Sequence, residues 1–193
     1  MPSLYPFQRQ AVDDLNNGAR LVVIGTGCGK SAVMMTWLKE TEKKRILIVT
    51  TPSKVKSGDF IKEAETWCGK GWVDSLTSFE VISWHKLKKW KEDHLGMIRY
   101  LKNRTEWAVA FDEVAKGKAG VSSGMGKAFE AIVKEIPVWS GYTATPGDKW
   151  IDLHAYMVAA GFFPNKTCFL KRHAYIDTYR GYPEITGYRD ESR

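Results

Sequence analysis

The sequence has few cysteines and no long apolar run. Its three cysteines, Cys28, Cys68 and Cys168, stand far apart and predict neither a disulfide framework nor a zinc site. No apolar stretch approaches the ~20 residues that span a bilayer, and the N-terminus lacks the hydrophobic segment of a signal peptide. The four histidines have no metal-ligand spacing. We therefore expect a protein of a reducing, cytoplasmic setting that has no membrane partner.

The composition is that of a folded, basic domain. Of the 193 residues, 44% are hydrophobic and 26% are charged, which is typical of a globular chain with a core of its own. The formal net charge of +7 favours an anionic partner, and nucleic acid is the usual one. The charge alone decides little, because many basic proteins bind no nucleic acid.

Short apolar runs alternate with helix-like segments along the chain. Short buried strands that alternate with helices are typical of a mostly parallel sheet covered on both faces, so the sequence predicts an α/β fold. From about Lys171 the pattern fades, and we expect a domain of residues 1–170 followed by a tail or linker of residues 171–193. The expected strands are residues 21–24, 46–49, 79–82, 108–111 and 138–140. The expected helices are residues 7–17, 31–39, 59–67, 84–90, 97–103, 126–134 and 150–160, the last being the final helix.

A glycine-rich turn follows the first expected strand. Its glycines allow backbone conformations that bring N–H groups against phosphate oxygens. At the start of the next helix, Lys30 would reach the β- and γ-phosphates of ATP, and the Ser31 hydroxyl would ligate Mg²⁺. The strict pattern Gly-x-x-x-x-Gly-Lys-Ser/Thr requires glycine where this chain has Ile24, but the strand–loop–helix context still predicts a phosphate site. The expected nucleotide loop consists of Gly25, Thr26, Gly27, Cys28, Gly29, Lys30 and Ser31.

Two adjacent carboxylates, Asp112 and Glu113, follow the fourth expected strand. Beside a phosphate loop, Asp112 would hold Mg²⁺ through its waters, and Glu113 would position and deprotonate the attacking water. The alternative is a solvated turn after a strand. The catalytic interpretation is favoured because open parallel sheets collect their ligands at the carboxyl ends of their strands.

Six separated segments resemble, in order, the motifs of superfamily 2 DNA helicases and translocases. The likeness is to the DEAH-like and chromatin-remodeller-like branch, above all to helicases encoded by bacteriophages. It covers roughly residues 4–170 and implies the first of two RecA-like domains, a P-loop NTPase fold of three layers, in a phage protein within a bacterial host. The six segments are residues 5–8, 25–31, 50–54, 83–87, 112–115 and 143–146.

The resemblance also implies roles for residues outside the phosphate loop. Gln8, with Tyr5 beside it, would recognise adenine, while Thr143 and Thr145 would couple hydrolysis to movement along the strand. DNA is the expected partner, and RNA stays open. Trp84 and Lys86 lie on a basic segment that is either part of a nucleic-acid surface or a solvated helix. The loop expected to contact the nucleic-acid backbone consists of Thr51, Pro52, Ser53 and Lys54.

Two departures from the family pattern change the expected activity. Ala115 stands where the family has His or Asp, so it cannot bond across to the segment around Thr143. Nothing after Pro146 resembles the Gln-x-x-Gly-Arg-x-x-Arg element of the family's second RecA-like domain, so we expect half of a motor that needs such a domain in cis or in trans. Because an arginine finger contributes about 10³–10⁵ in kcat, the chain alone should hydrolyse ATP slowly. The rival interpretation is a non-catalytic DNA- or partner-binding module that retains a nucleotide site.

Overall fold

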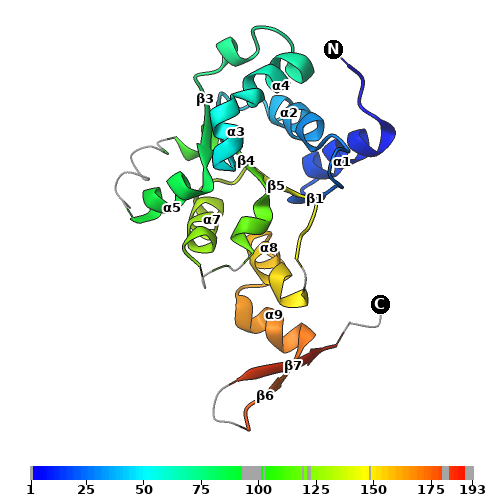
Figure 1. Cartoon of the computed structure of the whole chain (residues 1–193), viewed down its shortest axis with the longest axis vertical. Coiled ribbons are helices and arrows are strands. Elements are labelled where there is room, and N and C mark those ends of the chain that lie inside the picture. The colour runs from blue at the N-terminus through cyan, green and yellow to red at the C-terminus, as the bar shows by residue number, and fades with distance from the viewer. Residues whose placement is uncertain are drawn as a thin grey trace.

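A five-stranded parallel sheet forms the centre of the molecule (Figure 1). The computed structural model describes residues 2–92, 101, 103–118, 120, 123–147, 149–179 and 183–189. The strands lie in the order β1-β5-β4-β2-β3, so β4 is the central strand and lies between β5 and β2. The bounds of the strands are β1 Leu21–Val23, β2 Arg45–Thr50, β3 Ser78–Ser83, β4 Trp107–Asp112 and β5 Trp139–Thr143.

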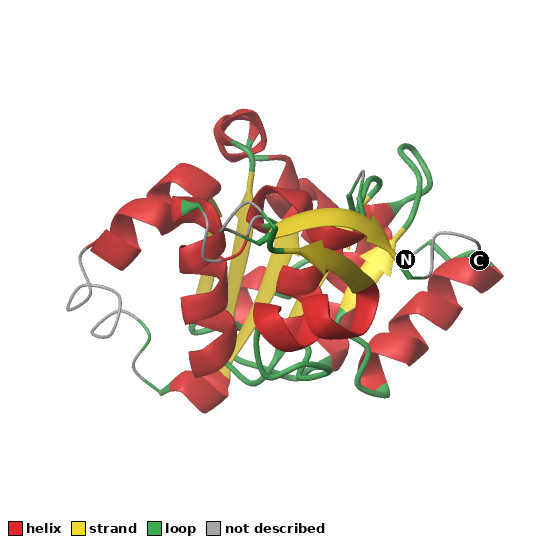
Figure 2. Ribbon diagram, turned by 90° about the horizontal axis from the view of Figure 1, so that it is seen from below, coloured by secondary structure: helices red, strands yellow, loops and turns green. Residues whose placement is uncertain are grey.

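Helices cover both faces of this sheet (Figure 2). Alternate residues of β2 divide between the two faces, because successive side chains of a strand point to opposite sides. Ile46 and Ile48 pack in the core that includes α1 (Pro6–Asn16), α2 (Lys30–Glu40) and α4 (Asp59–Cys68). Leu47 and Val49 pack in the core that includes α5 (Trp84–Glu92) and α7 (Gly124–Glu135). The predicted α/β fold with a mostly parallel sheet is therefore confirmed, and the molecule is a single domain.

The helices agree with the sequence prediction in most places. The exceptions are α3, which begins with Pro52 where a loop was expected, and the predicted helix 150–160, which is divided into η5 and α8. The predicted helix 97–103 lies mostly outside the described residues. The helices are α1 Pro6–Asn16, α2 Lys30–Glu40, α3 Pro52–Ser57, α4 Asp59–Cys68, α5 Trp84–Glu92, α7 Gly124–Glu135, α8 His154–Ala159 and α9 Lys166–His173. Short 3-10 helices are η1 Val73–Ser75, η2 Arg104–Glu106, η3 Val114–Gly117 and η5 Trp150–Leu153.

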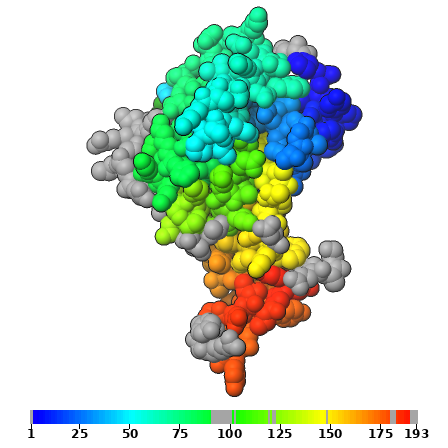
Figure 3. Space-filling view, viewed as in Figure 1, coloured from blue at the N-terminus to red at the C-terminus, as the bar shows by residue number. Residues whose placement is uncertain are grey.

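The C-terminal segment has regular structure that the sequence pattern did not predict. The expected last helix is followed by α9, whose first turn is capped by the Asn165 side chain accepting from the N–H of Cys168. An antiparallel hairpin of β6 Ala174–Asp177 and β7 Glu184–Tyr188 follows and projects from the body (Figures 1 and 3). Phe169 fixes α9 to the body, since its buried ring packs against Phe163 and against His154 of α8. The segment expected as a tail or linker from about Lys171 therefore contains the end of α9 and this hairpin, and its role as a linker toward a second domain stays a prediction.

None of the described helices has the length and the apolar character needed to cross a bilayer.

Candidate functional site

The glycine-rich loop joins the carboxyl end of β1 to the first residue of α2. Gly27 and Gly29 have φ angles of 76° and 80°, which a residue with a Cβ atom adopts only with strain. Gly29 is the N-cap of α2, so the free N–H groups of the first helical turn border the loop. The Lys30 ammonium turns back and donates to the main-chain oxygens of Ile24 at 3.2 Å and Gly25 at 3.4 Å. The loop thus carries the N–H donors and the cation that phosphate binding requires.

The side chain of Gln8, in α1, holds the glycine-rich loop in place. Its side chain is buried, its Oε1 accepts from the N–H of Tyr5 at 2.9 Å, and its Nε2 donates to the main-chain oxygen of Cys28 at 3.0 Å. A Cβ atom on Gly29 would collide with Nε2 of Gln8, so glycine is required there for space as well as for φ. Tyr5 is 69% exposed and stacks on Phe7. Recognition of adenine by Gln8 and Tyr5 stays a prediction, and the contact that the structure shows for Gln8 is with the loop.

The acidic pair lies at the carboxyl end of β4. Asp112 is only 2% exposed, and its Oδ2 accepts from the Thr50 hydroxyl at 2.6 Å and from the Lys54 ammonium at 2.8 Å. The main-chain oxygen of Asp112 accepts from the Trp84 indole at 2.9 Å. Glu113 has a φ of 51°, an uncommon conformation for a residue other than glycine. This turn directs the chain away from β4 immediately after the buried carboxylate.

Strand order places β5 between the phosphate loop and the acidic pair. Thr143 pairs with Val23 of β1, and the preceding residue, Tyr142, pairs with Asp112 of β4. The Thr143 hydroxyl is buried and accepts from the N–H of Thr145 at 3.1 Å. These threonines therefore lie between the two loops that hydrolysis would involve, and a coupling role for them stays a prediction.

One pocket joins the two loops. It has a volume of about 490 Å³ and is lined by residues from the glycine loop, from α3 and α4, and by Glu113. The expected residues in its wall are Thr26, Gly27, Gly29, Lys30, Ser31 and Glu113. The pocket is also lined by Ala32, Lys54, Glu63 and Trp67, none of which the sequence predicted as a nucleotide contact. The only sequence signal for Glu63 and Trp67 was their spacing of four residues, which puts both on one face of α4.

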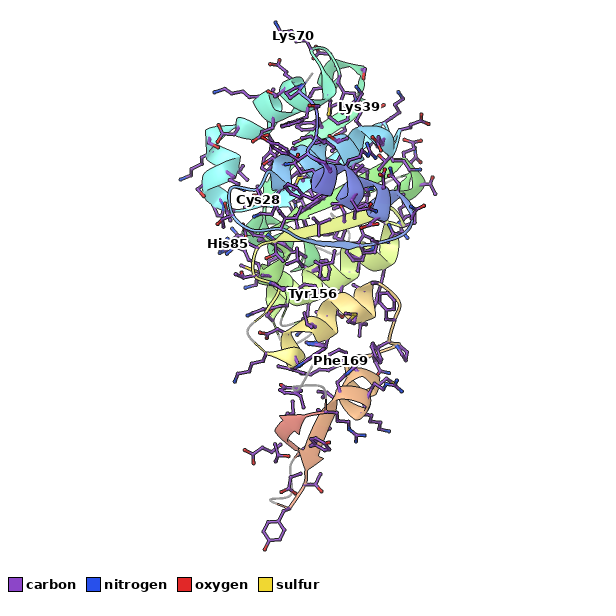
Figure 4. The ribbon with its side chains drawn as sticks, turned by 90° about the vertical axis from the view of Figure 1, so that its right-hand side faces the viewer. Cys28, Lys39, Lys70, His85, Tyr156 and Phe169 are labelled. Carbon is purple, nitrogen blue, oxygen red and sulfur yellow. The ribbon has the colours of Figure 1, made fainter. Side chains whose placement is uncertain are left out.

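A larger cavity of about 600 Å³ lies toward the other end of α2, where Arg9 and Lys39 contribute to its wall. Figure 4 labels Cys28 in the glycine loop and Lys39 near the opposite end of that helix. Trp67 borders both cavities, but the larger one contains neither the glycine loop nor Glu113. We place the candidate site in the smaller pocket, because the glycine loop and Lys30, which can bind phosphate, and Glu113, which can accept a proton, line it together. The volume of a cavity alone does not indicate a function.

Comparison with protein-family models and with curated proteins found no match. The functional assignment therefore depends on the geometry of the site.

The oxygen donors of the site fit a magnesium ion that is shared with a nucleotide. Among the described residues, no three His, Cys, Asp or Glu side chains gather as a metal cluster. The protein ligands on hand are the Ser31 hydroxyl and the Asp112 carboxylate, whose two hydrogen bonds from the described residues both fall on Oδ2. Mg²⁺ is commonly held by one or two such groups together with water and substrate phosphates, so this donor set suits Mg²⁺ only with a phosphate ligand present.

The residues predicted to contact nucleic acid lie at the same edge of the sheet but differ in exposure. Thr51, Pro52, Ser53 and Lys54 open α3 directly after β2, and Pro52 and Ser53 are exposed. Lys86 on α5 is exposed, with its ammonium 5.4 Å from the ring centroid of Trp90. Trp84 is fully buried against Phe111 and Phe129, so its prediction as a base-stacking surface residue is wrong.

Proposed function

We propose that this chain is the ATP-binding, RecA-like domain of a helicase-type ATPase that acts on DNA. The observation that carries the proposal is the 490 Å³ pocket, because the glycine loop, Lys30 and Glu113 form its walls together. The parallel sheet supports a RecA-like arrangement, since both chemical loops leave it at the carboxyl ends of strands.

In this proposal each group that lines the pocket has one role, as do two residues outside its lining: Asp112, which bonds to Lys54, and Gln8, which bonds to the glycine loop. The loop N–H groups and the Lys30 ammonium bind the phosphates, while the Ser31 hydroxyl and the Asp112 carboxylate hold the metal. Bound Mg²⁺ would neutralise charge that develops on the β- and γ-phosphates. Glu113 lines the same pocket as Lys30, which supports the proposal that its carboxylate orients a water molecule and accepts its proton. Gln8 maintains the loop by holding the Cys28 carbonyl.

The expected output of hydrolysis is movement along DNA, and it requires a second RecA-like domain. Stepping depends on a cleft that opens and closes between two domains, so we propose slow turnover and no unwinding by this chain alone. The exposed Pro52 and Ser53 and the basic face of α5 support a nucleic-acid contact at the edge of the sheet that also carries the pocket.

Replacing Glu113 separates binding from catalysis. Glu113→Gln removes the proton acceptor but keeps the shape of the side chain, so ATP affinity should stay while single-turnover hydrolysis in the presence of DNA falls by about 10²-fold or more. Glu65→Gln is the matched control on exposed α4 surface and should leave both unchanged. Hydrolysis by Glu113→Gln at the wild-type rate would refute the catalytic assignment.

The second candidate is a non-catalytic binding module that retains the nucleotide site. Two observations favour it: Lys54 already neutralises Asp112, and Ala115 has no polar side chain to couple hydrolysis to movement. ATP turnover measured with DNA and a second RecA-like domain supplied in trans distinguishes the two candidates. Turnover that stays at background while ATP is bound would favour the module.

A further inference from the structure

The buried carboxylate of Asp112 has a cation beside it in this structure, and that cation is a lysine. Burial of a charged carboxylate is costly unless a counter-charge or hydrogen bonds compensate it. Asp112 is 2% exposed, and its Oδ2 receives both the Thr50 hydroxyl and the Lys54 ammonium. Lys54 therefore provides the positive charge at Asp112, the carboxylate that would bind Mg²⁺ in our functional proposal.

The two partners of Asp112 differ in their freedom to move. Thr50 is fully buried as the last residue of β2, so its hydroxyl stays with the sheet. The Lys54 side chain is 42% exposed and extends from the six-residue helix α3. Lysine is a flexible chain that ends in a point charge, so it can exchange partners without moving the backbone.

Lys54 also borders the pocket itself. It lines the same 490 Å³ space as Lys30, Ser31 and Glu113. A divalent cation at Asp112 would stand next to the ammonium, and the two like charges would repel across a partly desolvated site. Mg²⁺ carries two charges and is also bound by the phosphates, so it would stay bound to the Asp112 carboxylate. The Lys54 side chain would move out into solvent.

We propose that Lys54 is the resident counter-ion of Asp112, that Mg²⁺ arriving with a nucleotide displaces it, and that the released ammonium then binds a phosphate of DNA. The inference rests on the proposed function, since it requires a Mg²⁺–nucleotide complex in the pocket. Lys54 is a positioning residue here, which alternates between the carboxylate and the nucleic-acid backbone. Because binding free energies are reciprocal, nucleotide and DNA strengthen each other's binding through this one side chain.

The first test compares stability with and without the metal–nucleotide complex. Lys54→Met removes the charge and keeps the length of the side chain, Lys54→Arg restores a charge, and Lys56→Met is the control on the exposed side of the same helix. In EDTA, Lys54→Met should melt below wild type, because Asp112 loses its counter-ion. Saturating Mg²⁺ with a non-hydrolysable ATP analogue should abolish the difference, since Mg²⁺ replaces the lysine. A deficit of equal size in both conditions would show that Lys54 is only structural and would overturn the proposal.

The second test measures the two affinities. The Mg²⁺ concentration that half-saturates analogue binding should fall about fivefold in Lys54→Met, the order expected for removing one partly exposed ion pair that competes with the metal. The analogue should strengthen single-stranded DNA binding about fivefold in wild type and in Lys56→Met, less in Lys54→Arg, and not in Lys54→Met. Equal gains in all four proteins would overturn the displacement while leaving the nucleotide site intact. Failure of the wild-type chain to bind the analogue would instead refute the functional proposal itself.

Discussion

The indole Nε1 of Trp84 donates a hydrogen bond of 2.9 Å to the main-chain oxygen of Asp112. Trp84 is the first residue of α5, which follows β3 at the edge of the sheet, while Asp112 ends β4 near its centre. The bond spans β2, the strand between them, and its two residues are both buried. The position of the acidic loop therefore depends on a helix that provides no group to the pocket.

Trp84→Phe should destabilise the protein by about 2–3 kcal/mol, because a buried carbonyl loses its donor and the smaller ring leaves space in the core. Denaturant unfolding measures this loss. Trp90→Phe makes the same substitution at a partly buried position of the same helix, and its cost should be smaller, under about 1 kcal/mol. Equal losses in the two variants would contradict the role assigned to the indole bond.

Gly29→Ala should lower stability and weaken ATP binding together. Alanine would have to adopt a positive φ at this position, and its Cβ atom would collide with Nε2 of Gln8. Gly71→Ala controls for the first effect, since Gly71 has a similar φ of 79° and open space around it, and should cost about 1 kcal/mol. Urea denaturation and nucleotide titration of both variants check this. The account requires a larger loss at Gly29, with ATP affinity reduced only there.

The cysteines should differ strongly in alkylation rate. Burial raises the pKa of the Cys68 thiol to about 11, although the charge of Lys39 lowers it in part. At pH 8 only about 10⁻³ of Cys68 is then the reactive thiolate, and its rate should rise about tenfold per pH unit while the fold persists. Cys28 is exposed in the glycine loop and should react faster. Mass spectrometry after iodoacetamide treatment reads both sites, and ATP with Mg²⁺ should protect Cys28 alone. Labelling of Cys68 as fast as that of Cys28 would contradict its burial.

Lys86→Ala should weaken DNA binding and flatten its dependence on salt. One lost phosphate contact reduces the slope of log affinity against log salt by about 1. Lys44→Ala removes the same charge just before β2, at the amino ends of the strands and therefore opposite the proposed interface. It should leave the slope unchanged. Fluorescence anisotropy at several salt concentrations measures both slopes. A slope that is the same in wild type and Lys86→Ala would remove α5 from the proposed interface.

The elements that the sequence predicted well are those with a strong local pattern. Strands β2 and β4 are largely continuous apolar runs. The glycine-rich turn after β1 and the acidic pair at the end of β4 are the residue types from which the candidate site was predicted. What failed depended on side chains from distant segments. The lysines around Trp84 favoured a surface position, but its spacing of three residues from Leu87 puts both side chains on one face of α5, and both are buried. No pattern could reveal that Lys54 reaches Asp112, which is 58 residues away in sequence.

The C-terminal segment was missed for a different reason. Helix α9 buries only Phe169, and strands β6 and β7 bury only Ala174, so these elements lack the apolar periodicity of a core element. Asn165 was the available signal, because its side chain caps α9.

Calorimetric titration of ATP with Mg²⁺ into wild type and Lys30→Ala tests the central claim most directly, with Lys44→Ala as the charge-matched control. Our account predicts saturable binding of one ATP per chain to wild type and to Lys44→Ala, and none measurable to Lys30→Ala. Equal affinity of ATP for wild type and Lys30→Ala, or no binding to wild type, would contradict it.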